Sequence, residues 1–193
     1  MVYLHYNQSE RNAFMKSLFK KDVAIQALLY IVNRIGERKD FHKIFKTLYF
    51  ADQRHLSRYA RSITGDRYIA MDYGPVPSNI DDILKALRGD SFFSFYAQEF
   101  KPLLTVKNKY LLEAKVDADL DYLSETDIEC LDEAIAECKD KSFDDLVKMS
   151  HGDAWLDTAK NGHIEVNKIL MEFGDNEEYA DFIKNKLMEE ACF

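Results

Sequence analysis

Two side chains in the first half of the chain have the types and the spacing for acid–base chemistry. Asp52 and His55 stand three residues apart in a segment with helical periodicity, so their side chains can meet. Both fall in the middle of the hydrophobic stripe of that helix, where a carboxylate is costly unless it is paired or hydrogen-bonded. The pair indicates either an acid–base dyad or partner-binding hot spot, or a buried polar latch. Such a latch would hold the next loop through Thr64, the backbone around Gly65, or Tyr73.

The other reactive groups do not form a recognised catalytic or metal-binding motif. His151, Asp153 and His163 have only a loose spacing, without the ligand pattern of a zinc site. Cys130 and Cys138 are eight residues apart in one expected helix, roughly 12 Å along its axis, which is beyond disulfide reach. The chain has no nucleophile elbow and no phosphate-binding glycine loop. We therefore expect reduced cysteines, no metal and no cofactor, and assign no catalytic residue.

A proline-containing loop and the single tryptophan are better suited to protein contacts. The segment Gly74 to Pro77 predicts a rigid non-helical turn. This turn either presents Tyr73 and Val76 to a partner at low entropic cost or simply joins a strand to a helix. Trp155 either anchors a helix to the core or acts as an interface hot spot.

The elements that must position these groups are mainly helices. Asp22 offers an N-cap for a helix over residues 23–35 that ends at Gly36. This helix is hydrophobic nearly all round, so we expect it at the centre of the domain. Asp40 caps a longer helix that runs to about residue 61, carries Asp52 and His55, and should pack on the first.

The rest of the chain predicts short strands and further helices. Residues 67–71 and a hairpin over residues 100–116 are expected to form one small antiparallel sheet. Ser124 and Ser142 each precede an aspartate by three residues, which is typical of a capping box. The remaining expected helices cover residues 9–19 (or a docking arm), 77–88, 152–160 and 175–191. The predicted class is α+β, predominantly α, with a small antiparallel sheet or hairpin.

Composition and charge limit the class of partner. The 193 residues are 47% hydrophobic and 31% charged, as in a globular domain. No signal peptide is evident, and the most hydrophobic segment, residues 23–32, is too short to span a bilayer. We therefore expect a cytoplasmic protein with no membrane partner.

The net charge of −8 is unevenly distributed along the chain. Residues 1–116 carry 19 Lys and Arg against 12 Asp and Glu, whereas residues 117–193 carry 7 against 22. The acidic half disfavours nucleic acid and favours a basic protein surface, unless the two halves attract each other internally. A basic stripe of Arg54, Arg58, Arg61 and Arg67 is interpreted as a solvated helix face, because no nucleic-acid reader motif accompanies it.

Several ordered segments together resemble a known family. Residues 45–52 read FKTLYFAD and are followed by His55-Leu56; residues 63–70 read ITGDRYIA, residues 73–77 read YGPVP, and Ser150-His151 precedes Trp155. These segments are similar to the Panacea, or SocA-like, antitoxin domain of bacterial and phage toxin–antitoxin systems. Its hallmarks are a K-L-L-Y-F-A-D helix, an I-T-G-D turn and a Y-G-P-V-P loop. Thr47 stands where the family usually has Leu.

The resemblance implies a non-catalytic antitoxin that binds a co-encoded protein toxin and masks it. It divides the chain into an N-terminal extension (1–21), the antitoxin domain (22–173) and a C-terminal acidic helix (174–193). We interpret the signature residues as mainly structural: Lys46, Tyr49, Asp52, His55, Thr64, Gly65, Asp66, Tyr73, Gly74, Pro75, Val76, Pro77, His151 and Trp155. Among them, Tyr73, Val76 and Trp155 are the expected partner-binding residues.

Two other functions stay open from the sequence. The first is a proteolytic adaptor that delivers a bound partner to a protease, motivated by the hydrophobic end of the tail at residues 189–193. The second is an enzyme that uses Asp52 and His55, which requires an open pocket at that pair. The sequence makes no prediction about self-association.

Overall fold

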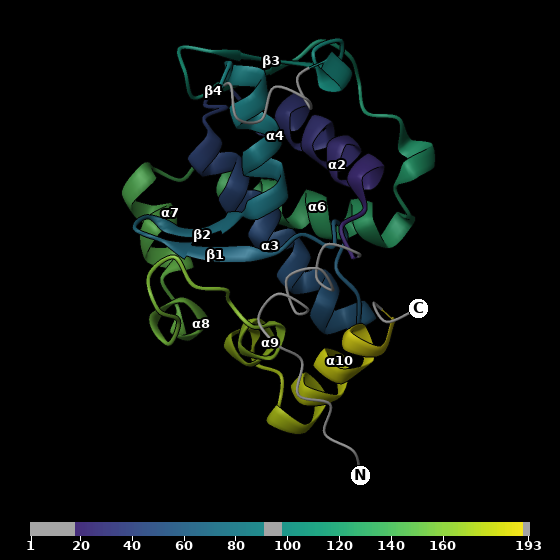
Figure 1. The fold of residues 1–193 in the computed structure, drawn as a ribbon, viewed down its shortest axis with the longest axis vertical. Coiled ribbons are helices and arrows are strands. Elements are labelled where there is room, and N and C mark those ends of the chain that lie inside the picture. The colour runs from purple at the N-terminus through teal and green to yellow at the C-terminus, as the bar shows by residue number, and fades with distance from the viewer. Residues whose placement is uncertain (1–17, 91–97, 191–193) are drawn as a thin grey trace.

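The computed structural model describes residues 18–90 and 98–190, which form a mainly helical domain with two small sheets (Figure 1). Each sheet is a pair of antiparallel strands. The predicted class, α+β with predominant helix, is confirmed. Among the described residues, no helix has both the length and the hydrophobicity to cross a membrane.

The first described helix, α2 (Lys21–Arg34), is buried on most of its surface, as its sequence predicts. Its N-cap is Lys20, without a side-chain hydrogen bond, so the prediction that Asp22 caps the helix is wrong. Asp22 lies instead in the first turn, where a negative charge is favourable next to the positive end of the helix dipole. Gly36 follows the helix with a φ of +92°, a conformation that glycine adopts without strain.

Helix α3 (Phe41–Tyr59) runs through the middle of the domain (Figure 1). Asp40 is its N-cap and accepts a hydrogen bond from the Lys43 backbone N–H at 3.0 Å, as predicted. The helix packs against α2 and, more extensively, against α6 (Glu125–Cys138). Because α3 is enclosed by neighbours, its polar side chains must find partners within the protein.

The two strands β1 (Tyr68–Met71) and β2 (Gly74–Pro77) form a ribbon that crosses α3. The sequence predicts a turn at residues 74–77 and a β1 strand joined to the later hairpin, and both expectations are wrong. Prolines are tolerated in β2 because of the direction in which their nitrogens point. The Ser78 N–H, directly after β2, points toward the chain of β1 and donates to the Arg67 carbonyl at 2.8 Å. Backbone N–H groups alternate in direction along a strand, so the nitrogens of Pro75 and Pro77 face away from β1, where no donor is required.

The hairpin, β3 (Leu104–Lys107) with β4 (Leu111–Ala114), is present as predicted but forms a separate sheet. It attaches to the start of α3 instead of β1. The Phe41 N–H donates to Tyr110 and the Leu112 N–H donates to Lys39, both at 2.9 Å.

The other edge of β1 is paired with an irregular segment of the second half of the chain. The Ala70 N–H donates to the Gly162 carbonyl at 2.9 Å, and the Ile164 N–H donates to the Tyr68 carbonyl at 2.9 Å. The ribbon is therefore held on both sides of β1.

The remaining helices agree with the sequence in most positions. Helix α4 (Ser78–Arg88) ends at Gly89, and both predicted capping boxes are present, at the starts of α6 and α7 (Phe143–Ser150). The helix expected over 152–160 is shorter, α8 (Asp153–Leu156), and the one expected over 175–191 is α10 (Glu177–Glu190). Helix α9 (Val166–Phe173) and the 3₁₀ turn η2 (Leu120–Tyr122) were not predicted. The helix or arm expected over 9–19 lies almost entirely outside the described residues.

The basic and acidic halves of the chain meet between α3 and α6. Arg54 pairs with Glu133 and Glu137, and Arg58 pairs with Glu129 and Glu133. Much of the predicted basic stripe therefore faces an acidic helix of the same chain.

Candidate functional site

Four polar side chains of α3 form what we call the buried polar row: Lys46, Tyr49, Asp52 and His55. All four are at most 1% exposed. They follow one another at intervals of three residues, which turns each side chain by about 60° relative to the one before. One helix therefore directs four buried polar groups toward four different neighbouring segments.

Asp52 accepts hydrogen bonds from the segment that follows α3. Its Oδ1 accepts from the backbone N–H of Ile63 at 2.8 Å and of Thr64 at 3.2 Å. Its Oδ2 accepts from the Thr64 hydroxyl at 2.7 Å and the Tyr68 hydroxyl at 2.8 Å. Burial raises the pKa of Asp52, and these hydrogen bonds oppose that effect. This is the geometry of the latch interpretation, with Tyr68 in place of the expected Tyr73.

His55 turns away from Asp52 and contacts the start of α6. Its Nδ1 lies 2.8 Å from the Arg61 carbonyl, so Nδ1 carries a hydrogen and donates it to that carbonyl. Its Nε2 lies 3.1 Å from Asp127 Oδ1. Burial raises the pKa of Asp127, but hydrogen bonds from His55, Ser124 and Arg61 outweigh it and hold that pKa below its ordinary value. The two residues of the supposed dyad thus have separate partners.

Lys46 holds the outer edge of the ribbon. Its Nζ donates to the Pro75 carbonyl at 2.8 Å, and burial lowers its pKa to about 7. Gly74, the residue before Pro75, packs against the Lys46 side chain and has a φ of +98°. A Cβ atom at this position would collide with Ser150 Oγ and Lys46 Cε. The glycine of the Y-G-P-V-P loop is therefore required both by its conformation and by the close approach of α3 and α7.

Tyr49 positions the short helix α8, which carries the tryptophan. Its hydroxyl donates to Glu172 Oε1 at 2.9 Å, and the other oxygen of Glu172 accepts from the Ala154 N–H at 2.9 Å. Trp155 donates from Nε1 to the Met71 carbonyl at 2.9 Å and stacks on His151 with ring centroids 3.6 Å apart. Sequence reasoning missed Glu172, because it lies on the unpredicted helix α9.

The I-T-G-D turn is fixed by its own residues. Asp66 accepts from the backbone N–H groups of Asn79 at 3.0 Å and Ile80 at 2.9 Å, so it caps α4 from outside. Burial raises the pKa of Asp66 to about 6. Gly65 has a φ of +67°, and a Cβ atom there would collide with the Leu18 carbonyl. The signature turn is thus a junction between α4 and the chain that leads into α2.

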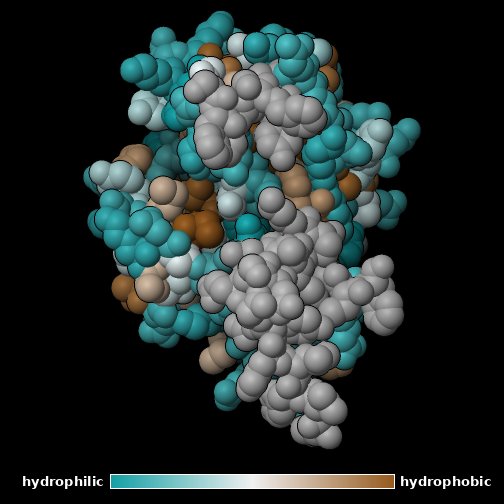
Figure 2. All heavy atoms as spheres, in the orientation of Figure 1, coloured by the Kyte–Doolittle hydropathy of each residue, from teal (hydrophilic) through white to brown (hydrophobic). Residues whose placement is uncertain are grey.

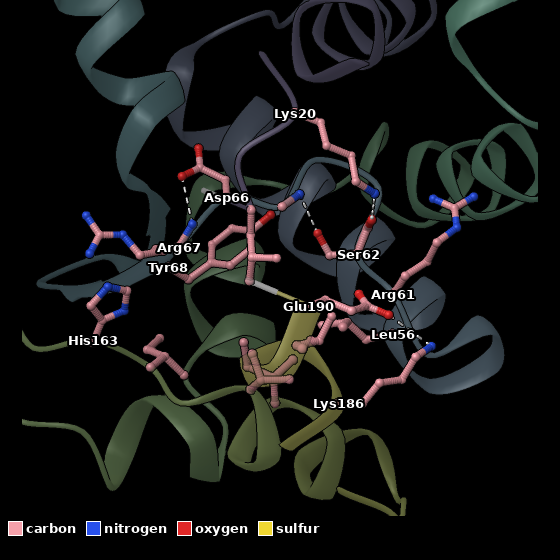
Figure 3. A pocket seen from close by; sticks show the side chains of 16 residues that line it. Lys20, Leu56, Arg61, Ser62, Asp66, Arg67, Tyr68, His163, Lys186 and Glu190 are labelled. Carbon is pink, nitrogen blue, oxygen red and sulfur yellow. Dashed lines mark hydrogen bonds and ion pairs between the residues drawn. The ribbon is translucent and has the colours of Figure 1, made fainter. Parts of the chain in front are cut away.

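A cavity of about 170 Å³ opens beside this turn, between the end of α3, α9 and α10 (Figure 3). Its floor is hydrophobic and includes Leu56, and Lys20 and Lys186 belong to its lining. Ser62 lies in the lining, but its hydroxyl accepts from the Gly65 N–H and its carbonyl accepts from Lys20 (Figure 3). Figure 3 also shows Lys186 directed toward Glu190, 3.6 Å away. Ser62 therefore ties the turn to the residue before α2, and the Lys186–Glu190 ion pair lies within α10.

The expected partner-binding residues all lie at or near the ribbon. Tyr73 is 62% exposed in the turn between the strands, whereas Val76 and Trp155 are half-buried. Val76 is paired in register with Ile69 on the face of the ribbon opposite α3. Within the described ranges, no group of three or more His, Cys, Asp and Glu side chains could hold a metal ion.

Comparisons with known proteins place this arrangement in one family. No curated protein and no solved structure matches the chain. The family model described as "Antitoxin SocA-like, Panacea domain" matches residues 44–156, which is more than half of the chain. The matched range begins within α3 and ends at α8, and it contains the whole buried polar row and the ribbon. The chain therefore belongs to the family of SocA-like antitoxins with a Panacea domain.

Proposed function

We propose that this protein neutralises a co-encoded protein toxin by binding it directly, without catalysis. Membership of an antitoxin family supports the general role. The observation that carries the mechanism is the burial of the signature side chains: Lys46, Asp52 and His55 are at most 1% exposed and bonded to the protein's own segments. These groups stabilise a scaffold, so contact with the toxin falls to exposed residues around them.

The same observation argues against an enzyme that uses Asp52 and His55. Acid–base catalysis requires both groups within reach of one substrate proton. Asp52 is committed to the segment 63–68 and His55 to Arg61 and Asp127, and neither side chain reaches solvent. A binding protein, acting in the cytoplasm where its toxin is made, needs no such access.

Inducible expression of the adjacent open reading frame, alone and together with this chain, tests the proposal. We expect growth arrest from the neighbour alone, rescue by co-expression, and co-elution of the two purified proteins on size exclusion. A frameshifted copy of the antitoxin gene is the matched control, because it makes the same transcript without the protein. Absence of rescue by the intact gene, or rescue by the frameshifted copy, would contradict the proposal.

The abundance of the toxin in the rescued cells separates masking from delivery to a protease. Direct masking predicts that the toxin accumulates in the complex. A toxin that disappears upon co-expression would instead support the proteolytic adaptor.

A further inference from the structure

Exposed hydrophobic side chains gather at the turn end of the β1–β2 ribbon, where α7 and α8 flank it (Figure 1). We call this group the tip surface, and it consists of Met71, Tyr73, Phe143, Trp155 and Leu156. Tyr73 and Leu156 are 62% exposed, and Met71 and Phe143 are 39% exposed. Figure 2 shows further hydrophobic atoms gathered over the ribbon itself. Such a cluster differs from the isolated exposed hydrophobic residues that any surface carries.

The members of the tip surface form two groups, which meet where β1 leads into the turn. The rings of Tyr73 and Phe143 meet edge to face with centroids 5.3 Å apart. Met71, two residues before Tyr73, lines a depression together with Trp155 and Leu156. Three separate elements therefore contribute to one contact area that is rich in aromatic residues and methionine, as the centres of protein interfaces are.

The tip surface is rigid, although it is exposed. The Trp155 indole donates to the Met71 carbonyl at 2.9 Å, and the His42 ring lies 3.3 Å from the Tyr73 carbonyl through Nε2. Beneath the turn, Lys46 holds the Pro75 carbonyl. Because the turn is already held in place, binding a partner here costs little conformational entropy, which favours affinity.

Three exposed carboxylates flank the tip surface, and Lys160, the lysine that lines its depression, is paired with Asp72. Asp144, Asp153 and Asp157 are exposed on α7, on α8 and at the end of α8. In the part of the chain that the structure describes, none of these three carboxylates forms an ion pair with Lys or Arg. A partner surface with the complementary charge is therefore basic.

We propose that the tip surface is the toxin-binding site and that the toxin presents a hydrophobic anchor flanked by Lys or Arg. This inference rests on the proposed function. Tyr73 and Leu156 supply the exposed contact area, Trp155 supports it from below, and Val76 extends it along the outer face of the ribbon. Asp144, Asp153 and Asp157 supply the acidic rim.

The test compares variants of equal exposure at and away from the tip surface. Tyr73→Ser and Leu156→Ser change the tip, whereas Phe182→Ser changes a residue of α10 that is also 62% exposed. The probe is the purified product of the toxic adjacent reading frame, titrated against each full-length variant after circular dichroism has confirmed its folding. We expect Kd to rise at least 30-fold for Tyr73→Ser, as for an interface hot spot. The Phe182→Ser variant should bind within about 3-fold of wild type, as expected for a position outside the interface.

Salt and charge provide a second readout. The wild-type Kd should rise with ionic strength, and the double substitution Asp153→Asn with Asp157→Asn should weaken this dependence. If Tyr73→Ser and Leu156→Ser bound the toxin as strongly as wild type, the tip surface would be refuted as the toxin-binding site, and the proposed antitoxin function would still stand. A wild-type chain that neither binds nor rescues would instead refute the proposed function, and with it this site.

Discussion

The latch formed by Asp52 makes a quantitative prediction for protein stability. The substitution Asp52→Ala removes the acceptor of two buried backbone N–H groups, those of Ile63 and Thr64. It also leaves the hydroxyls of Thr64 and Tyr68 without their acceptor. The hydroxyls can rotate toward other partners, but the backbone N–H groups cannot.

Each buried donor left without a partner costs about 1–3 kcal/mol. Two such N–H groups therefore cost about 2–6 kcal/mol. Removing the carboxylate offsets part of this cost, because burial disfavours its charged form, as the raised pKa of Asp52 indicates. We expect a net loss of about 3 kcal/mol in the free energy of unfolding. For a chain of this size, that corresponds to a fall of roughly 6–12 °C in melting temperature.

Asp52→Asn separates the hydrogen bonds from the charge. Both backbone N–H groups donate to the same oxygen, Oδ1, which an asparagine retains. The new amide group can donate to the two hydroxyls that previously donated to Oδ2. We therefore expect this variant to lie within about 1 kcal/mol of wild type. Because the pKa of Asp52 is raised by burial, the stability that it contributes is complete below about 3.8 and is lost as the pH rises through the raised value.

Urea unfolding followed by circular dichroism provides the measurement, with Asp72→Ala as the control. Asp72 is an exposed aspartate whose side chain pairs with Lys160 on the surface, so its loss should cost less than about 1 kcal/mol. The latch interpretation fails if Asp52→Ala costs no more than the control. It also fails if Asp52→Asn is as destabilising as Asp52→Ala, because the charge of Asp52 and not the hydrogen bonds that it accepts would then account for the loss of stability.

Three further measurements follow from the surroundings of α3. Burial lowers the pKa of Lys46 to about 7. The stability that Lys46 contributes is therefore complete above 10.5, its pKa in the unfolded chain, and is lost as the pH falls through 7. Between pH 7 and 10, the melting temperature of wild type should rise relative to that of Lys46→Met. Burial and the charge of Lys46 lower the pKa of His42 to about 4, so wild type should lose stability relative to His42→Gln as the pH falls from 6.5 through 4, in thermal scans at each pH. Arg58 is partly exposed, so Arg58→Ala should cost less than about 1 kcal/mol in urea unfolding, and the loss should shrink in high salt.

The parts of the fold with local signals could be predicted from the sequence. Asp40 and the capping boxes at Ser124 and Ser142 begin their helices where expected, because a cap is a contact between residues three positions apart. Helix α9 lacks such a signal: its N-cap is Glu165, without a side-chain hydrogen bond, and it spans eight residues. Strand β2 was not predicted because Pro75 and Pro77 favour a turn in sequence reasoning, although prolines are compatible with the edge of a sheet.

The candidate site shows the same division between local and distant contacts. The position of Asp52 on a hydrophobic stripe predicts that it is buried and hydrogen-bonded, and its partners Thr64 and Tyr68 lie within 16 residues. The partner of His55 is Asp127, which follows 72 positions later in the chain. Nothing in the periodicity around His55 identifies that partner, so the sequence suggests a dyad that the fold does not form.

The spacing of the buried polar row explains how one helix can support a binding surface without contributing to it. Steps of three residues direct Lys46 to the ribbon, Tyr49 to the glutamate that holds the start of α8, and Asp52 to the turn that caps α4. The segments that carry the tip surface, the proposed binding site, are thus fixed from below by buried side chains. Exposed positions such as Tyr73 and Leu156 carry few of these bonds, and surface substitutions away from such networks usually change stability by less than about 0.5 kcal/mol. Partner choice can therefore change at the tip while the buried scaffold remains intact.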